Sequence, residues 1–333
     1  MQMKKGLKVL LYLSYFIFMY FFIFSTLVFK IHMPIPSDLT YDLNAMRTQS
    51  EFEEYAYLVE DRHFAQSLRL ALIEQATTSI DVSYYTIHNG ISRDYFYGAL
   101  LEAADRGVKV RLILDGTLHQ QVGPAKPPFD ALALHENITL KLYDEVSLLA
   151  PHAVHNVLHD KFLIIDEQYG LTGGRNIGDR YYEDSEDLTA MTYDRDVLIF
   201  SKTGVSNAVA DMKSYYDELF NHEYSSLYTA RETKRVQEAN VMMRNIFNDH
   251  KALHDYQGLI DGVYDDAIRV DNVTFMRSPL TRMQKDPVIM RYLGMLAEEY
   301  DEIFLQSPYI IFSKPMLELM PDLTGKNVTI LTN

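Results

Sequence analysis

The sequence of 333 residues contains no cysteine. Disulfide bonds and thiolate metal sites are therefore excluded, although the lack of cysteine does not choose a cellular compartment. Positive charge is also scarce, because 31 Lys and Arg residues face 46 Asp and Glu residues and leave a formal charge of −15. Proteins that follow a nucleic-acid backbone need clustered cations. We therefore expect no nucleic-acid partner, although a small local basic pocket is compatible with this balance.

The composition is nevertheless that of a folded protein. Apolar residues make up 47% of the chain and charged residues 23%, which is typical of globular proteins and not of disordered ones. The length suits about two domains of ordinary size.

The amino-terminal segment is the longest stretch without charge. Lys4, Lys5 and Lys8 precede the run Val9–Phe29, 21 uncharged residues that as a helix would span roughly 30 Å, the hydrocarbon thickness of a bilayer. We predict a retained transmembrane helix. A cleaved signal peptide is the alternative, although no small-residue cleavage site follows the run. Because three lysines precede the run and only Lys30 closely follows it, the positive-inside rule predicts that the rest of the chain lies outside the cytoplasm.

Helix-type and strand-type patterns then alternate, after a linker predicted at residues 31–60. Residues 64–78 and 93–107 have helical spacing of apolar side chains, whereas residues 79–87 and 108–115 have strand patterns. A strand, a helix and a strand in this order predict a right-handed crossover between parallel strands. We therefore predict an α/β fold.

A weaker similarity appears near the C-terminus. The stretch "EIFLQSPYIIF" (302–312) resembles "SIDVSYYTIH", and "KNVTILTN" (326–333) resembles "GVKVRLILD". Any two buried strands look alike, so duplication and chance both remain open. The predicted divisions of the chain are a membrane anchor at 1–30, a linker at 31–60, a catalytic half at 61–225, a helical segment at 226–300 and the start of a second, truncated half at 301–333.

The stretch "HDKFLIIDEQYGLTGGRN" carries the most chemistry. Residues two apart in a strand point to the same face, so His159 and Lys161 are expected side by side. Gly173 and Gly174 let a backbone approach a ligand and offer N–H groups to an anion, and Asn176 adds a neutral donor. A nucleophilic imidazole, an ammonium group and N–H donors suit attack on a phosphodiester, with the developing charge held without a metal.

"HDKFLIID" followed by "GGRNIGD" resembles the HKD motif of the phospholipase D superfamily, His-x-Lys-x4-Asp-x6-Gly-(Gly/Ser)-x-Asn. The form "GGRNIGDRYY" is most similar to that of bacterial cardiolipin synthases of the C type. The resemblance covers most of residues 60–333 and is strong at 155–182. It implies a phospholipase D-like α-β-α sandwich half with a mixed sheet, in an enzyme where two HKD motifs form one site. One histidine of the two becomes phosphohistidine and the other protonates the leaving group.

The resemblance also implies roles for single residues. His159 would be the nucleophile or its acid partner, and Asp166 would be a structural acid of the catalytic motif. Three residues would contact the phosphate: Lys161, Gly174 and Asn176. Asp196 matches the position of an acid that orients the histidine, as an imidazole nucleophile requires. A turn-forming role for Asp166 and a plain strand-start role for Asp196 are the alternatives.

His152, His155 and His159 have a spacing that could bind zinc on a helix. Pro151 precedes them and a strand pattern follows them, so we expect the first two to be ordinary rim residues. Neither a metal nor a cofactor is predicted.

Only one His-x-Lys stands in the sequence. A missing C-terminal segment could supply the second HKD half, or a homodimer mate could, or the chain could be inactive alone. The predicted function is phosphatidyl transfer of the cardiolipin synthase type, on phosphatidylglycerol or a similar phospholipid. The predicted location is a bacterial inner or plasma membrane, with the catalytic domain extracytoplasmic. Phospholipid hydrolysis, nuclease activity and a catalytically incomplete membrane protein are the alternatives, and the sequence does not identify the acceptor alcohol.

Overall fold

The protein is described here from a computed structural model. The residues that the structure describes are 5–24, 42–46, 50–117, 122–146, 151–282, 287–312 and 314–332. The end of the predicted anchor and part of the predicted linker lie outside them. The linker prediction is wrong at residues 54–59, which form a strand of the central sheet.

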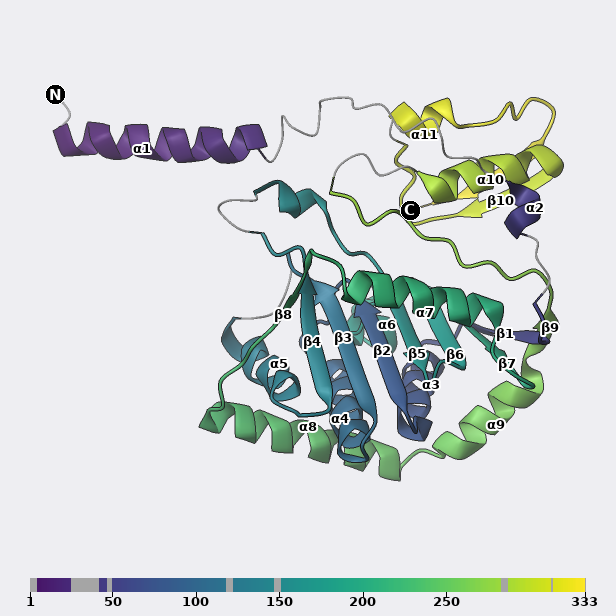
Figure 1. Ribbon diagram of the computed structural model, residues 1–333, viewed down its shortest axis with the longest axis horizontal. Coiled ribbons are helices and arrows are strands. Elements are labelled where there is room, and N and C mark those ends of the chain that lie inside the picture. Colours follow the sequence, from purple (N-terminus) through teal and green to yellow (C-terminus); the bar gives the residue numbers. More distant parts are fainter. Residues whose placement is uncertain are drawn as a thin grey trace.

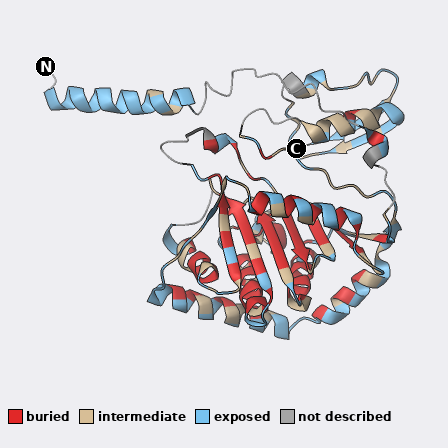
Figure 2. Ribbon diagram, viewed as in Figure 1, coloured by how far each residue is buried: buried red, intermediate tan, exposed pale blue. Residues whose placement is uncertain are grey.

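Helix α1 (Lys5–Phe22) is the first described element, and none of its residues is buried (Figure 2). Its mean hydropathy is 1.3, and it is long and apolar enough to cross a membrane. A signal sequence near an N-terminus has the same properties. The helix that the sequence predicts is therefore present, and both interpretations of it remain.

A large mixed sheet forms the centre of the protein (Figure 1). Within the described residues its order is β8-β4-β3-β2-β5-β6-β7-β1-β9. The strands are β1 (Glu54–Val59), β2 (Ser79–Tyr84), β3 (Lys109–Asp115), β4 (Ile138–Tyr143), β5 (Lys161–Ile165), β6 (Tyr169–Gly173), β7 (Asp196–Ser201), β8 (Ser225–Leu227) and β9 (Ile268–Val270). β2, β3 and β4 pair in parallel, as the crossover pattern predicts, whereas β5 pairs antiparallel with β2. The predicted α/β class with a mixed sheet is confirmed.

Helices cover both faces of this sheet. α3, α4 and α5 pack on one face and α7 on the other, and α8 and α9 pack outside the first group (Figure 1). The helices are α3 (Arg62–Gln75), α4 (Ile91–Asp105), α5 (Lys126–Ala133), α6 (Asp179–Tyr182), α7 (Asn207–Phe220), α8 (Lys234–Ala252) and α9 (Tyr256–Asp266). Short 3-10 helices are η3 (Gly123–Ala125), η4 (Pro151–His155) and η5 (Leu188–Ala190).

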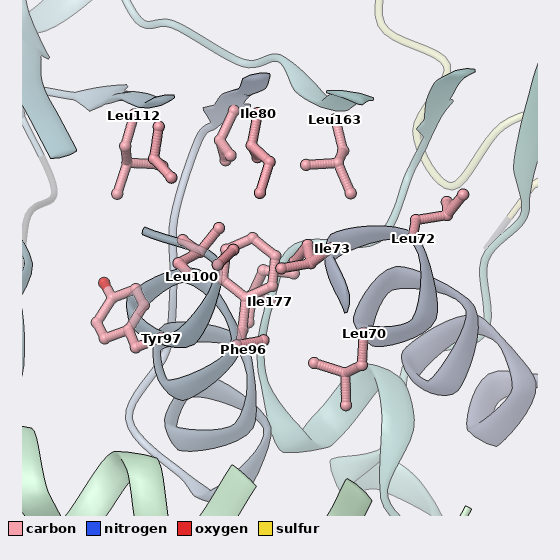
Figure 3. Packing of buried hydrophobic residues seen from close by; sticks show 14 of the residues in the cluster. Leu70, Leu72, Ile73, Ile80, Phe96, Tyr97, Leu100, Leu112, Leu163 and Ile177 are labelled. Atoms are coloured by element: carbon pink, nitrogen blue, oxygen red, sulfur yellow. The ribbon is translucent and has the colours of Figure 1, made fainter. Parts of the chain in front are cut away.

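The strand β5 joins the two halves of the core because its side chains alternate between the faces. Leu163 and Ile165 belong to the apolar cluster on the α3 and α4 side, and Figure 3 shows Leu163 pointing from the sheet toward those helices. Phe162 and Ile164 belong to the cluster under α7. Since all four are buried, β5 is a central strand whose position is strongly determined.

Asp166 anchors the far end of β5. Its carboxylate accepts hydrogen bonds of 2.8–2.9 Å from the N–H groups of Thr77, Thr78 and Ser79 and from the hydroxyls of the two threonines. Its φ of 52° lies in the left-handed region, which aspartate tolerates better than most residues do. The Asp166 side chain therefore fastens β5 to the start of β2.

A small separate sheet lies near the C-terminus. β10 (Glu302–Gln306) and β11 (Asn327–Leu331) pair in parallel, beside α10 (Val288–Glu299) and α11 (Lys314–Glu318). The short helix α2 (Leu43–Met46) contacts α10. The two strands predicted in this region are present.

Replacing Asp166 by alanine should lower the free energy of unfolding by about 3 kcal/mol, because the hydrogen bonds that join two central strands are lost together. Denaturant titration of the detergent-solubilised protein, followed by circular dichroism, measures the change. Asp187, whose carboxylate accepts hydrogen bonds from the N–H and hydroxyl of Thr189 in an exposed loop, is the matched control. Its alanine variant should unfold at nearly the same denaturant concentration as the unaltered protein, and an equal loss in both variants would contradict the anchoring role of Asp166.

Candidate functional site

His159 and Lys161 lie together at the start of β5, where β2 ends. Lys161 pairs with Tyr84 in the sheet. Its Nζ lies 3.3 Å from Nε2 and 3.4 Å from Nδ1 of His159, and it donates a 3.0 Å hydrogen bond to the His159 carbonyl oxygen. Lys161 is only 7% exposed, whereas His159 is exposed. A cation and an imidazole accessible to a ligand thus occupy one edge of the sheet.

Neighbouring strands hold this edge in place. The Tyr85 N–H donates to the carbonyl oxygen of Asp160 at 2.8 Å, and the Leu158 N–H donates to the Asp115 carboxylate at 2.7 Å. The Tyr85 ring then stands 4.7 Å from the imidazole of His159, centre to centre. Tyr85 therefore lines the site and does not belong to the buried core.

The local environment changes the proton affinity of both groups. Burial lowers the pKa of His159 below its usual range, and the neighbouring Lys161 ammonium lowers it further. Burial also lowers the pKa of Lys161 to about 8, although the carboxylates of Asp160 and Asp194 oppose this change. At neutral pH the site therefore combines a neutral imidazole with a mostly protonated ammonium group, the pair that nucleophilic attack on a phosphodiester needs.

The glycine pair makes room for two carboxylates. A Cβ atom on Gly174 would lie 2.0 Å from a carboxylate oxygen of Asp194, and one on Gly173 would lie 2.2 Å from an oxygen of Asp196. The N–H of Gly174 donates to the Arg195 carbonyl oxygen at 3.0 Å. Because this N–H has a backbone partner, the arrangement does not offer it to a phosphate, and Gly174 acts here by allowing close approach.

Asp196 belongs to a buried ion cluster. Its Oδ2 lies 2.9 Å from a guanidinium nitrogen of Arg69 and 2.8 Å from one of Arg175. No hydrogen bond to His159 is present among the described residues. The structure thus does not bring the proposed orienting residue to the histidine, and Arg175, next to the glycine pair in the sequence, is buried inside the fold.

Asn176 contacts the chain just after the end of β2, close to the site. Its Oδ1 accepts a 3.4 Å hydrogen bond from the Thr86 N–H, and its Nδ2 donates to the Tyr181 hydroxyl at 3.0 Å. The structure describes no direct contact between this amide and His159 or Lys161. Asp166, at the opposite end of β5, is remote from the imidazole and has the structural role described above.

A cavity of about 320 Å³ opens beside His159 and Lys161. One wall is the extended segment 273–282, which we call the strap, and Leu280 of the strap is buried against the cluster under α7. Arg277 of the strap pairs with Glu218. The strap thus covers the α7 side of the sheet edge.

The histidine spacing does not produce a metal site. His155 ends η4 and is exposed, and the chain from there to β5 is not helical, so the three histidines do not share a helix face. Nothing is described of the His152 side chain. In the part of the chain that the structure describes, no group of three potential ligands is close enough to hold a metal ion.

The chain is similar to known families and proteins. Residues 70–205 match the family model described as "Cardiolipin synthase, PLD-like domain". This region is similar to phospholipase D-like domains, and it contains all the residues proposed for the HKD site. Cardiolipin synthase C of Escherichia coli K12 is 32% identical to this chain over 162 residues, which are 46% of this chain and 33% of that protein.

Two further relatives extend the similarity. An uncharacterised Helicobacter pylori 26695 protein is 28% identical over 304 residues, 84% of this chain and 59% of that protein. The crystal structure of phosphatidylserine synthase from Haemophilus influenzae shares the fold, with a TM-score of 0.55 at 14% identity over 85% of this chain and 64% of that one. The chain spans about three fifths of the length of the first curated relatives it matches.

Sequence reasoning missed three features of the site. Asp194 lies two residues before Asp196 in "DRDVLIF", and only the structure shows that the charge of Asp194, with that of Asp160, acts on Lys161. The sequence favours a core position for Tyr85, whereas the structure places its ring beside His159. The strap lies more than a hundred residues after His159 and carries no motif, so no signal in the sequence points to it.

The low pKa of Lys161 predicts how activity depends on pH. The second-order rate constant kcat/KM should fall as pH rises through about 8, because the Lys161 ammonium group, which we expect to bind phosphate, loses its proton. Lys161→Arg should move this alkaline limb out of the accessible range, since arginine keeps its charge. A pH-rate profile of both forms on a phosphodiester substrate is the measurement. If the alkaline fall in kcat/KM is unchanged in Lys161→Arg, it is caused by the titration of another group.

Proposed function

We propose that the protein is a membrane-anchored phosphatidyltransferase of the cardiolipin synthase type that acts through a phosphohistidine. The observation that carries this proposal is the contact of 3.3–3.4 Å between the Lys161 ammonium and the His159 ring, at the mouth of a cavity large enough for a lipid head group. The phospholipase D-like domain and the cardiolipin synthase relative support the same chemistry.

The proposed reaction has two steps. A ring nitrogen of His159 attacks the phosphorus of a phospholipid, the P–N bond forms, and the bond to the head-group oxygen breaks as that oxygen takes a proton. The hydroxyl of an acceptor alcohol then attacks the phosphorus and gives its proton to the group that protonated the head-group oxygen, and the P–N bond breaks to release the histidine. Lys161 stabilises the charge on the phosphoryl oxygens, and Asn176 is proposed to join it there. Asp194 is proposed to help keep the Lys161 charge in place.

The leaving group needs a proton donor. We propose that a second HKD half supplies it, either from a longer form of the chain or from a second copy. The predicted divisions of the chain suit this arrangement, with residues 61–225 as the catalytic half and 301–333 as the beginning of the second half.

The proposed membrane location is supported by α1, whose exposed apolar surface suits a bilayer. An anchored enzyme can reach a phospholipid substrate, phosphatidylglycerol or a similar lipid, in the plane of the same membrane. We propose the bacterial plasma membrane, with the catalytic domain on its outer side. Hydrolysis is the competing outcome, because water can attack the same phosphohistidine.

His159→Ala should abolish cardiolipin formation, because no other group in the described site can form the P–N bond. Lipid mass spectrometry of membranes incubated with phosphatidylglycerol measures the product, and acid-labile labelling of the protein by substrate phosphate detects the intermediate.

His63→Ala is the control, since His63 is exposed and pairs with Asp184 away from the cavity. It should retain activity. Cardiolipin formation that survives in His159→Ala would overturn the proposal, and release of phosphatidic acid alone by the unaltered protein would identify a hydrolase.

A further inference from the structure

The cavity beside His159 has a second polar group that the phosphate chemistry does not use. His159 and Lys161 stand at its rim, and the residue between them, Asp160, lines its α7 side together with Tyr215. The Tyr215 hydroxyl donates a 2.7 Å hydrogen bond to Oδ2 of Asp160, and the Ser83 hydroxyl donates to the same oxygen at 3.3 Å. A carboxylate and a phenol are thus joined within one ligand-sized space.

This pair is held rigidly. The Tyr215 ring lies 6.1 Å from the ring of Phe162 on β5 and 5.7 Å from that of Phe275 on the strap, centre to centre. The Arg277 guanidinium stacks over its outer side at 5.3 Å. Burial raises the pKa of Tyr215 well above its usual value, so its hydroxyl keeps the proton that it donates to Asp160. The hydroxyl oxygen retains lone pairs that can accept from a ligand.

The chemistry of the pair selects among ligands. A carboxylate repels a phosphate group, so the α7 side of the cavity is a poor second phosphate site. An acyl chain bound there would exclude water from the Asp160 carboxylate and would offer it no hydrogen bond, which is unfavourable. Alcohol hydroxyls suit the pair, because they donate to the carboxylate and to the phenol oxygen and can accept from neighbouring donors.

We propose that Asp160 and Tyr215 form a binding site for the polyol end of the acceptor, a glycerol-type diol, under the strap. The inference rests on the proposed function, since it assigns the acceptor side of the same cavity. A diol bound there has its hydroxyl groups beside His159, where one of them can attack the phosphohistidine before water does. The site would therefore favour transfer over hydrolysis.

Binding of glycerol tests the proposal without requiring turnover. Saturation-transfer NMR on the full chain in deuterated detergent should show contact between the protein and glycerol, and a much smaller contact with 1-propanol, which has one hydroxyl. Asp160→Asn should weaken glycerol binding by about tenfold or more, because hydrogen bonds to a charged acceptor are the stronger kind. Tyr215→Phe should weaken it severalfold.

The next residue on α7 provides a matched control. Tyr216 is also buried, but its hydroxyl donates to the Arg111 carbonyl oxygen, and Tyr216 does not line the cavity. Tyr216→Phe should bind glycerol as the unaltered protein does. Equal binding by Tyr215→Phe, or no glycerol contact in the unaltered protein, would overturn the proposal.

A second readout separates this inference from the proposed function. With phosphatidylglycerol and added glycerol, the ratio of transfer product to hydrolysis product should drop in Tyr215→Phe and stay unchanged in Tyr216→Phe. Glycerol binding without any lipid turnover would refute the transferase function while leaving the polyol site in place. Turnover with an unaltered ratio in Tyr215→Phe would refute the acceptor site alone.

Discussion

The pairing of β5 between β2 and β6 is the constraint on which the site depends. It sets Lys161 opposite Tyr84, at the point where β2 gives way to Tyr85. Because β5 is buried on both faces, a shift of one residue would place its apolar side chains on the wrong clusters. Asp166 fastens the far end of the strand to β2. The core therefore determines where the imidazole and the ammonium group stand.

Two buried cations in this domain show the difference between structural and functional charge. Arg175 is 1% exposed and is neutralised by the Asp196 carboxylate at 2.8 Å, as a charge inside a fold must be. Lys161 is nearly as buried, yet its described contacts are an imidazole, a carbonyl oxygen and the Tyr85 ring, with no carboxylate in ion-pair contact. A cation held in this way is destabilised until an anion arrives. This is the physical reason for regarding the edge of β5 as a binding site for phosphate.

The two sides of the β5 edge also carry groups with different chemistry. The Lys161 ammonium and the His159 imidazole line the cavity. Asp160, between them in the sequence, points toward α7 and the strap. A donor phosphate and an acceptor alcohol could thus approach the same point from different sides.

Local patterns in the sequence determined α3, β2, α4 and β3, the apolar N-terminal helix and the closeness of His159 to Lys161. Strand and helix periodicity and the two-residue repeat of a strand are properties of neighbouring residues, so they are readable without the fold. Only the tertiary structure decided that the Asp194 charge acts on Lys161, that the Gly174 N–H is already bonded, and that residues 275–280 line the cavity. Those facts depend on which distant segments meet, and contacts between distant segments leave no periodic trace in a single sequence.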